Sequence, residues 1–192
     1  LHDGSAKRPL AIFAMSSKVE RIKYNDSYIV RMLTLLDEVM VGFHAILGLL
    51  ALIGGTWFFA EMRKRQVDIR TVKFLSLAIA SLVWITWLTG GWWYVNYYPV
   101  DRAVINAGAM PYAHSLVMET KEHIFYIGLL IATTLPIYVY GLSNKLVAGD
   151  AGAKRLLMAL AVIVVLGGIV LESAGGLISI AAKYSWMVMA GG

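Results

Sequence analysis

The sequence predicts an all-α, integral-membrane four-helix up-and-down bundle with an N-terminal amphipathic arm. Of the 192 residues, 59% are apolar and only 15% are charged, and the mean hydropathy is +0.68. A soluble domain carries more charge. Four stretches also reach the ~20 mainly apolar residues that a helix needs to cross a hydrocarbon core. We place these spans near 36–62, 74–98, 115–142 and 156–183.

The spans divide the chain into an arm, residues 1–35, and a bundle, residues 36–192. In the arm, apolar residues alternate with charges at roughly helical spacing, which predicts an amphipathic helix on the membrane surface. An arm that packs on a partner subunit is an equal alternative. The apolar positions are Val19, Ile22, Ile29, Met32 and Leu33.

The basic residues predict an orientation in the plasma membrane. Five Lys or Arg residues lie around the first connection and three in the third, whereas the middle connection holds only Arg102. Because positively charged connections resist translocation, we expect both termini and the middle connection to be extracytoplasmic. Six basic residues in the arm oppose this orientation. The net charge is +5, and the basic residues that produce it flank the spans. Anionic membrane lipid, and not nucleic acid, is therefore the expected partner.

Aromatic residues and prolines predict where the middle connection begins and ends. The runs 92–94 and 97–98 contain only Trp and Tyr, which is typical of a membrane interface. Pro99 is expected to stop the second helix, and Pro111 suits the first turn of the third. Pro136 falls inside the third helix and is expected to kink it.

Histidines and glycines predict a cofactor site near the extracytoplasmic side. His44 and His123 lie at similar predicted depths in the first and third spans. These spans are diagonal neighbours in an up-and-down bundle, so two imidazoles can bind one iron axially. Glycine pairs at the same predicted depth in the other two spans, and a glycine one turn from His44, leave room for a flat macrocycle. These glycines are Gly90, Gly91, Gly175, Gly176 and Gly48.

This pattern predicts haem b with His44 and His123 as metal ligands. The chain has no cysteine, which excludes disulfides, covalent c-type haem and cysteine-ligated iron–sulfur clusters. A different metal site, a proton site, or simple close packing of helices at the glycines are the alternatives.

Three further polar residues are candidates for the same site. His114 lies nine residues before His123, which puts the two on opposite faces of a helix, so His114 is expected to cap, bind a propionate or face solvent. Glu119 lies four residues before His123 and can accept its hydrogen bond, or simply favour the helix start. Glu172 lies within the fourth span, where it is either protonated or part of a proton path to a quinone. Lys121 and Arg102 are placed to neutralise propionates or to extend toward the interface.

The first two spans also resemble a known family. The run Phe43–Gly55, which is followed by Glu61–Arg65, is similar to the first helix of the copper-resistance CopD and cytochrome b561-like membrane proteins. The segment Leu88–Gly91 is similar to their glycine-bearing next helix. The resemblance covers two helices, and it implies haem b ligated by histidines within a helical bundle, or copper handling.

Together these observations predict a b-type cytochrome subunit that transfers electrons within a larger respiratory or photosynthetic complex, more than an autonomous enzyme. Copper handling is an alternative because methionines lie near the same membrane face. A cofactor-free accessory subunit is another. A diiron-carboxylate site is not expected, because Glu119 and His123 lack the required spacing. The methionines are Met40, Met118, Met187 and Met189.

Overall fold

The computed structural model describes residues 27–191, with side chains described over residues 35–190. Most of the predicted arm, including Val19 and Ile22, therefore lies outside the described residues. Residues Val41–Gly192 form one compact unit, which holds the bundle.

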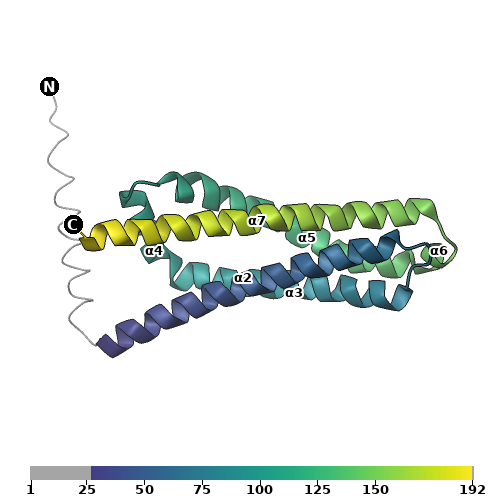
Figure 1. The fold of residues 1–192 in the computed structure, drawn as a ribbon, viewed down its shortest axis with the longest axis horizontal. Coiled ribbons are helices and arrows are strands. Elements are labelled where there is room, and N and C mark those ends of the chain that lie inside the picture. Colours follow the sequence, from purple (N-terminus) through teal and green to yellow (C-terminus); the bar gives the residue numbers. More distant parts are fainter. Residues whose placement is uncertain (1–26, 192) are drawn as a thin grey trace, which may run out of the picture. The chain divides into compact units, whose positions relative to one another are not determined.

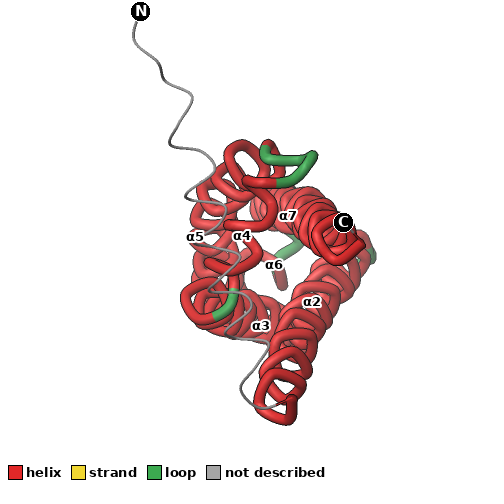
Figure 2. Tube along the Cα trace, turned by 90° about the vertical axis from the view of Figure 1, so that its left-hand side faces the viewer, coloured by secondary structure: helices red, strands yellow, loops and turns green. Residues whose placement is uncertain are grey.

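Helices make up this unit, and no strand occurs in the described part of the chain (Figure 1). Four long helices, α2, α3, α5 and α7, form the bundle, which Figure 2 shows end on. The short helix α6 lies at one end of the bundle and α4 lies toward the other, so we name these the α6 end and the α4 end. In order, the elements are α2 (Ser27–Arg63), α3 (Ile69–Asn96), α4 (Tyr98–Ala107), a π-helical turn (Ala113–Met118), α5 (Glu119–Gly141), α6 (Ser143–Val147) and α7 (Ala151–Gly191).

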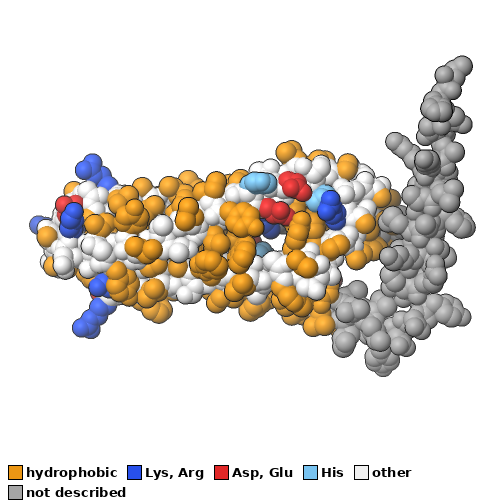
Figure 3. Space-filling model, turned by 180° about the vertical axis from the view of Figure 1, so that it is seen from behind, with side chains coloured by type: hydrophobic (Ala, Val, Ile, Leu, Met, Phe, Trp, Pro, Cys, Tyr) orange, Lys and Arg blue, Asp and Glu red, His pale blue; other side chains and the backbone are white. Residues whose placement is uncertain are grey.

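The long helices confirm the predicted membrane bundle. The segments long and apolar enough to cross a membrane are Leu35–Arg63, Ile69–Asn96, Ala113–Gly141 and Ala151–Ala190. Large apolar side chains are exposed along all four, and Figure 3 shows them covering the bundle while Lys and Arg gather at the α6 end. The chain is therefore a multi-pass membrane protein whose helices contact lipid.

The second span begins five residues before the predicted one, because a capping residue precedes its charged first turns. The Asp68 carboxylate accepts hydrogen bonds from the Arg70 amide (3.0 Å) and the Thr71 hydroxyl (2.7 Å). The bond from the Thr71 hydroxyl, followed by the one from the Arg70 amide, lowers the pKa of Asp68. Arg70 and Lys73 make this stretch look like a loop in the sequence.

The middle connection contains more helix than the prolines predict. Helix α3 ends at Asn96, but Pro99 then lies in the first turn of α4. The third span opens with the π-helical turn directly after Pro111, and α5 continues through Pro136 to Gly141.

Two apolar clusters fill the bundle. The first, here called the α6-end core, joins α2, α3, α5, α6 and α7 with buried aliphatic and aromatic side chains: Phe58, Met62, Val72, Leu75, Ile79, Leu135, Val139, Leu146, Ala153, Leu157 and Ala161. The second, here called the α4-end core, contains Tyr98, Ile105, Ala113, Met118, Ile178, Ala181 and Ala182. The candidate site lies between these clusters.

Candidate functional site

Glycines on three helices make room for three polar side chains of the bundle. A Cβ atom at Gly90 would lie 2.5 Å from Cε1 of His44, so only glycine allows the imidazole to pack there. Gly48 faces the Glu172 carboxylate so closely that a Cβ atom would overlap Oε1. Opposite Gly175, a Cβ atom would lie 3.1 Å from Nζ of Lys121. These glycines therefore admit side chains of this protein.

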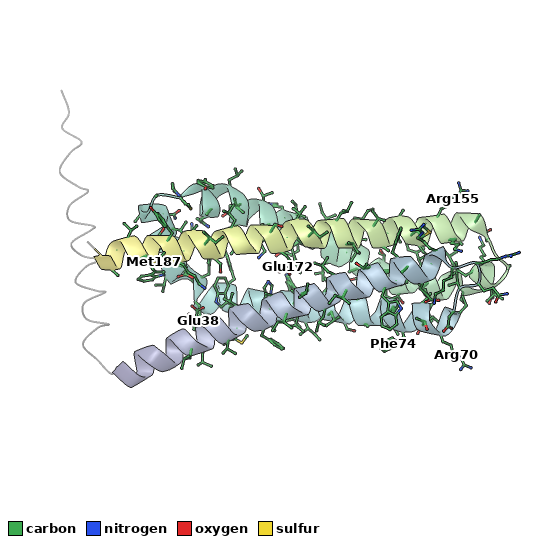
Figure 4. All side chains as sticks on the ribbon, viewed as in Figure 1. Glu38, Arg70, Phe74, Arg155, Glu172 and Met187 are labelled. Carbon is green, nitrogen blue, oxygen red and sulfur yellow. The ribbon has the colours of Figure 1, made fainter. Side chains whose placement is uncertain are left out.

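The three polar side chains line one cavity between α2, α3, α5 and α7. The cavity volume is about 120 Å³. Its walls are mainly apolar, and at Gly128 and Gly167 a Cβ atom would meet no atom within 4 Å. Figure 4 shows Glu172 about halfway along α7. We call His44, Thr86, Lys121, Glu172 and the glycines around them the cavity layer.

The His44 ring has a fixed orientation. Its Nδ1 lies 2.9 Å from the Thr86 carbonyl oxygen, and because a carbonyl only accepts, Nδ1 carries the proton and donates. In the neutral ring, Nε2 then keeps a lone pair, and no partner for it occurs among the described residues. The Thr86 hydroxyl is also buried, and it has no hydrogen-bond partner within the described part of the chain. His44 and Thr86, which both line the cavity, thus each carry a polar atom without a partner among the described residues.

Lys121 and Glu172 add opposite charges to the cavity. The Lys121 ammonium is close enough to interact electrostatically with both the Glu172 carboxylate and the His44 ring. The two residues form no direct ion pair within 4 Å, since the pairs found in the described chain are Lys64 with Glu61 and His114 with Glu119.

The cavity layer lies at hydrocarbon depth. Thr86 is 17 residues after the start of α3 and 10 before its end, or roughly 26 Å and 15 Å at about 1.5 Å per residue. Polar and ionisable groups at such depth are costly unless they serve a function or find partners. The depth makes the cavity layer the strongest candidate site.

The structure separates His44 and His123, which the sequence predicts as a ligand pair. His123 is exposed on the outside of α5, where Nδ1 donates to the Glu119 carbonyl of its own helix at 2.6 Å. Lys121, two residues earlier, faces the cavity, and two residues turn a helix by roughly 200°. The predicted pairing rested on similar depths of His44 and His123 in the membrane and did not consider which face of α5 His123 occupies.

The two histidines also lie at different levels. Trp84 Nε1 donates to Thr133 Oγ1 at 3.0 Å, and Tyr94 interacts with Glu122, which fixes the antiparallel register of α3 and α5. His123 is thus level with Tyr94, among the interfacial aromatic residues. His44 instead contacts Thr86 and Gly90, one to two turns deeper. Counting from the predicted helix ends was misleading because α2 begins at Ser27, well before residue 36.

The other predicted residues divide between three places. Gly48, Gly90, Gly175 and Glu172 belong to the cavity layer, whereas Gly91 and Gly176 have nothing within 4 Å of an added Cβ atom. His114 is buried against Tyr98 at the α4 end, with Glu119 half-exposed beside it.

Sequence reasoning missed Thr86 and the cavity role of Lys121. A signal existed for the cavity itself, because the pair Gly167 and Gly168 lies just before Glu172 in the fourth span. The sequence contains no comparable signal for Thr86, because it does not show which carbonyl or hydroxyl group contacts His44. None of the methionines in the described part of the chain lines the cavity.

These residues supply only one of the two histidine ligands that the sequence predicts for a haem iron. The Nε2 lone pair of His44 is suited to bind iron, and the Thr86 carbonyl orients the ring as carbonyls often do for metal-binding histidines. Lys121 can neutralise a propionate. No second histidine lines the cavity, and no group of three His, Asp or Glu side chains in the described residues is arranged as a metal site.

Comparison with known proteins gives no match: no family model, curated protein or solved structure is similar to this chain. The resemblance of the first two spans to the CopD and cytochrome b561-like group stays a prediction.

Proposed function

We propose that this protein is a membrane b-type cytochrome subunit that holds one haem beside His44. The observation that carries the proposal is the imidazole of His44, which the Thr86 carbonyl holds through Nδ1 and which lines a mainly apolar cavity at hydrocarbon depth. Bound haem supplies one-electron transfer. Among the described residues no second histidine lines the cavity, so a second histidine ligand would come from a neighbouring subunit.

The chain's own residues have separate roles in this proposal. His44 would hold the haem iron through Nε2, and the Thr86 carbonyl holds its ring in place. Lys121 offsets the negative charge of a propionate, while Glu172 keeps the cavity electrically balanced and can hold a proton. Gly90 and Gly48 leave the room in which the His44 ring and the Glu172 carboxylate pack against α3 and α2.

We place the protein in the plasma membrane, with the α4 end extracytoplasmic, because Lys and Arg gather at the α6 end. Almost all described residues belong to the bundle, so the electron donor and acceptor are other subunits of a membrane complex.

A difference spectrum tests this function. Purified protein, reduced with dithionite minus oxidised, should show the absorption bands of haem b. His44→Ala should lose the haem, whereas His123→Ala is a matched control that should keep it, because its ring lies outside the cavity. If His123→Ala loses the haem and His44→Ala keeps it, the cavity is not the haem site. A colourless protein with stoichiometric copper would support copper handling instead.

A quinol site is the second candidate, favoured by the proton-accepting groups of the cavity layer. The Nε2 lone pair of His44 can accept the proton of one quinol hydroxyl, and the Glu172 carboxylate that of the other. The mouth of the cavity lies between lipid-facing helices, which suits an apolar ligand.

Binding of decylubiquinol in detergent distinguishes this candidate from the first. A quinol site predicts saturable binding to haem-free protein that Glu172→Gln weakens by about tenfold, the effect of one charge-assisted hydrogen bond. The absence of saturable binding to the unaltered protein would exclude the quinol candidate.

A further inference from the structure

A second polar cluster lies at the α4 end, away from the cavity layer. The Tyr98 hydroxyl and Nδ1 of His114 are 3.1 Å apart, and the two residues are only 1% and 4% exposed. His114 reaches this position from the π-helical turn that opens the third span. Such turns are often found at functional sites. The buried hydrogen bond therefore joins two titratable groups inside the α4-end core.

The order of the groups in the cluster favours movement of a proton from Tyr98 toward His114. The Glu119 carboxylate beside Nε2 favours the His114 tautomer with its proton on that nitrogen, and in this tautomer Nδ1 accepts the O–H of a neutral Tyr98. Nε2 lies 3.9 Å from Oε1 of Glu119, whose side chain is half-exposed. The order from inside to outside is phenol, imidazole and carboxylate, with the carboxylate placed to stabilise a protonated imidazole.

Aromatic rings surround the phenol. Tyr98 stacks on Tyr94 with ring centres 5.1 Å apart and contacts Trp93 at 5.5 Å. Trp92 and Tyr97 form a neighbouring pair at 5.5 Å. Rings at these spacings can pass an electron by short steps. The phenol of Tyr98 therefore combines electronic contacts with a fixed base, which an exposed tyrosine lacks.

The charged surroundings keep the phenol protonated in its resting state. Burial, followed by the nearby Tyr94 and Asp101 side chains, raises the pKa of the Tyr98 hydroxyl, and Arg102 opposes this effect. Glu122 contributes a further negative charge from α5. A protonated phenol beside a base is the required starting state for coupled loss of a proton and an electron.

We propose that Tyr98 is a redox-active tyrosine whose proton passes to His114 on one-electron oxidation. The oxidant is a one-electron acceptor, such as a ferric haem of the same or a neighbouring subunit, or a photo-oxidised metal complex. It takes one electron from the phenol and is reduced by one unit. The Tyr98 O–H bond breaks, an N–H bond forms at Nδ1 of His114, and Glu119 stabilises the resulting imidazolium. The products are a neutral tyrosyl radical and a protonated histidine, and the reverse step restores the phenol.

Flash photolysis with a ruthenium tris-bipyridine complex and persulfate tests this proposal without any bound cofactor, so it stands or falls independently of the haem. The purified full chain in detergent should yield a neutral tyrosyl radical by electron paramagnetic resonance. Tyr98→Phe should remove most of this signal. Tyr97→Phe is the matched control and should leave it, because Tyr97 lacks the histidine partner.

The proton acceptor is tested with His114→Gln, whose amide oxygen can keep a hydrogen bond to Tyr98 but is a very weak base. The rate of radical formation should fall about tenfold or more, as expected on loss of a positioned base. The rate in the unaltered protein should also be slower in D₂O, and this isotope effect should change in the variant. Glu119→Gln should give a smaller decrease in rate.

Two results would overturn the proposal. One is an unchanged radical yield in Tyr98→Phe. The other is a His114→Gln protein that keeps both the rate and the isotope effect of the unaltered protein. Far-ultraviolet circular dichroism of each variant identifies loss of folding. If a variant is unfolded, Glu119→Gln decides, because it alters only a half-exposed residue: slower radical formation supports the proposal, and an unchanged rate overturns it.

Discussion

The α6-end core and the cavity layer are both built from the four long helices, with α6 added in the core, but they are packed in opposite ways. In the core, large side chains such as Phe58 and Ile79 interlock and are fully buried. In the cavity layer, glycines stand where the core has large residues, and polar side chains line the cavity. Lipid tails provide no strong hydrophobic drive for helices to associate, so close packing must hold the bundle together. The comparison indicates that the core supplies this stability, which allows the cavity layer to remain incompletely packed.

The largest expected effect comes from a cavity made in the core. Phe58→Ala removes a side chain that is 0% exposed, and we expect it to lower the free energy of unfolding by about 3 kcal/mol or more. Trp57→Ala is the matched control, because Trp57 is 55% exposed and lipid or detergent replaces its contacts. Unfolding by sodium dodecyl sulfate in mixed micelles, followed by circular dichroism, measures both. Equal losses would show that the α6-end core is not the stabilising region.

A smaller effect is expected when a methyl group is added to the cavity layer. Gly90→Ala forces the His44 ring away from Thr86, since the new Cβ would lie 2.5 Å from Cε1, and overpacking of this kind costs about 1–3 kcal/mol. Any ligand bound through His44 should also be lost. Gly91→Ala is the control, because nothing lies within 4 Å of its Cβ position. The same titration, together with the haem spectrum, measures the difference, and similar behaviour of the two variants would contradict the contact between Gly90 and His44.

The smallest effect concerns the cap at the α6 end. Hydrogen bonds lower the folded-state pKa of Asp68 below its ordinary value of 3.8. Its contribution to stability is therefore complete above that value and is lost as the pH falls through the lower, folded-state pKa. The protection of the first-turn amides of α3 against hydrogen exchange, measured relative to the intrinsic rate at each pH, should fall in acid. Asp68→Asn keeps a capping oxygen but cannot titrate, so the extra acid dependence should disappear, and its persistence would assign it to another group.

The sequence alone was sufficient to predict the fold. Four apolar stretches of sufficient length require four spanning helices, because backbone groups in lipid must be satisfied within each helix. The structure confirms this all-α bundle, although Asp68 and Pro99 shift the helix boundaries. The importance of His44, Glu172 and several glycines was also evident, since polar or very small residues stand out in an apolar span.

The tertiary structure alone decided which of these residues meet. A helix can satisfy its own backbone at any rotation about its axis, so hydropathy does not determine the face that each residue presents to its neighbours. Packing placed Lys121 in the cavity and His123 outside it, although only two residues separate them. Packing likewise brought His44 to Thr86, and His114 to Tyr98. The helices and their lengths follow from local composition, whereas the site depends on rotation and register, which only contacts between helices fix.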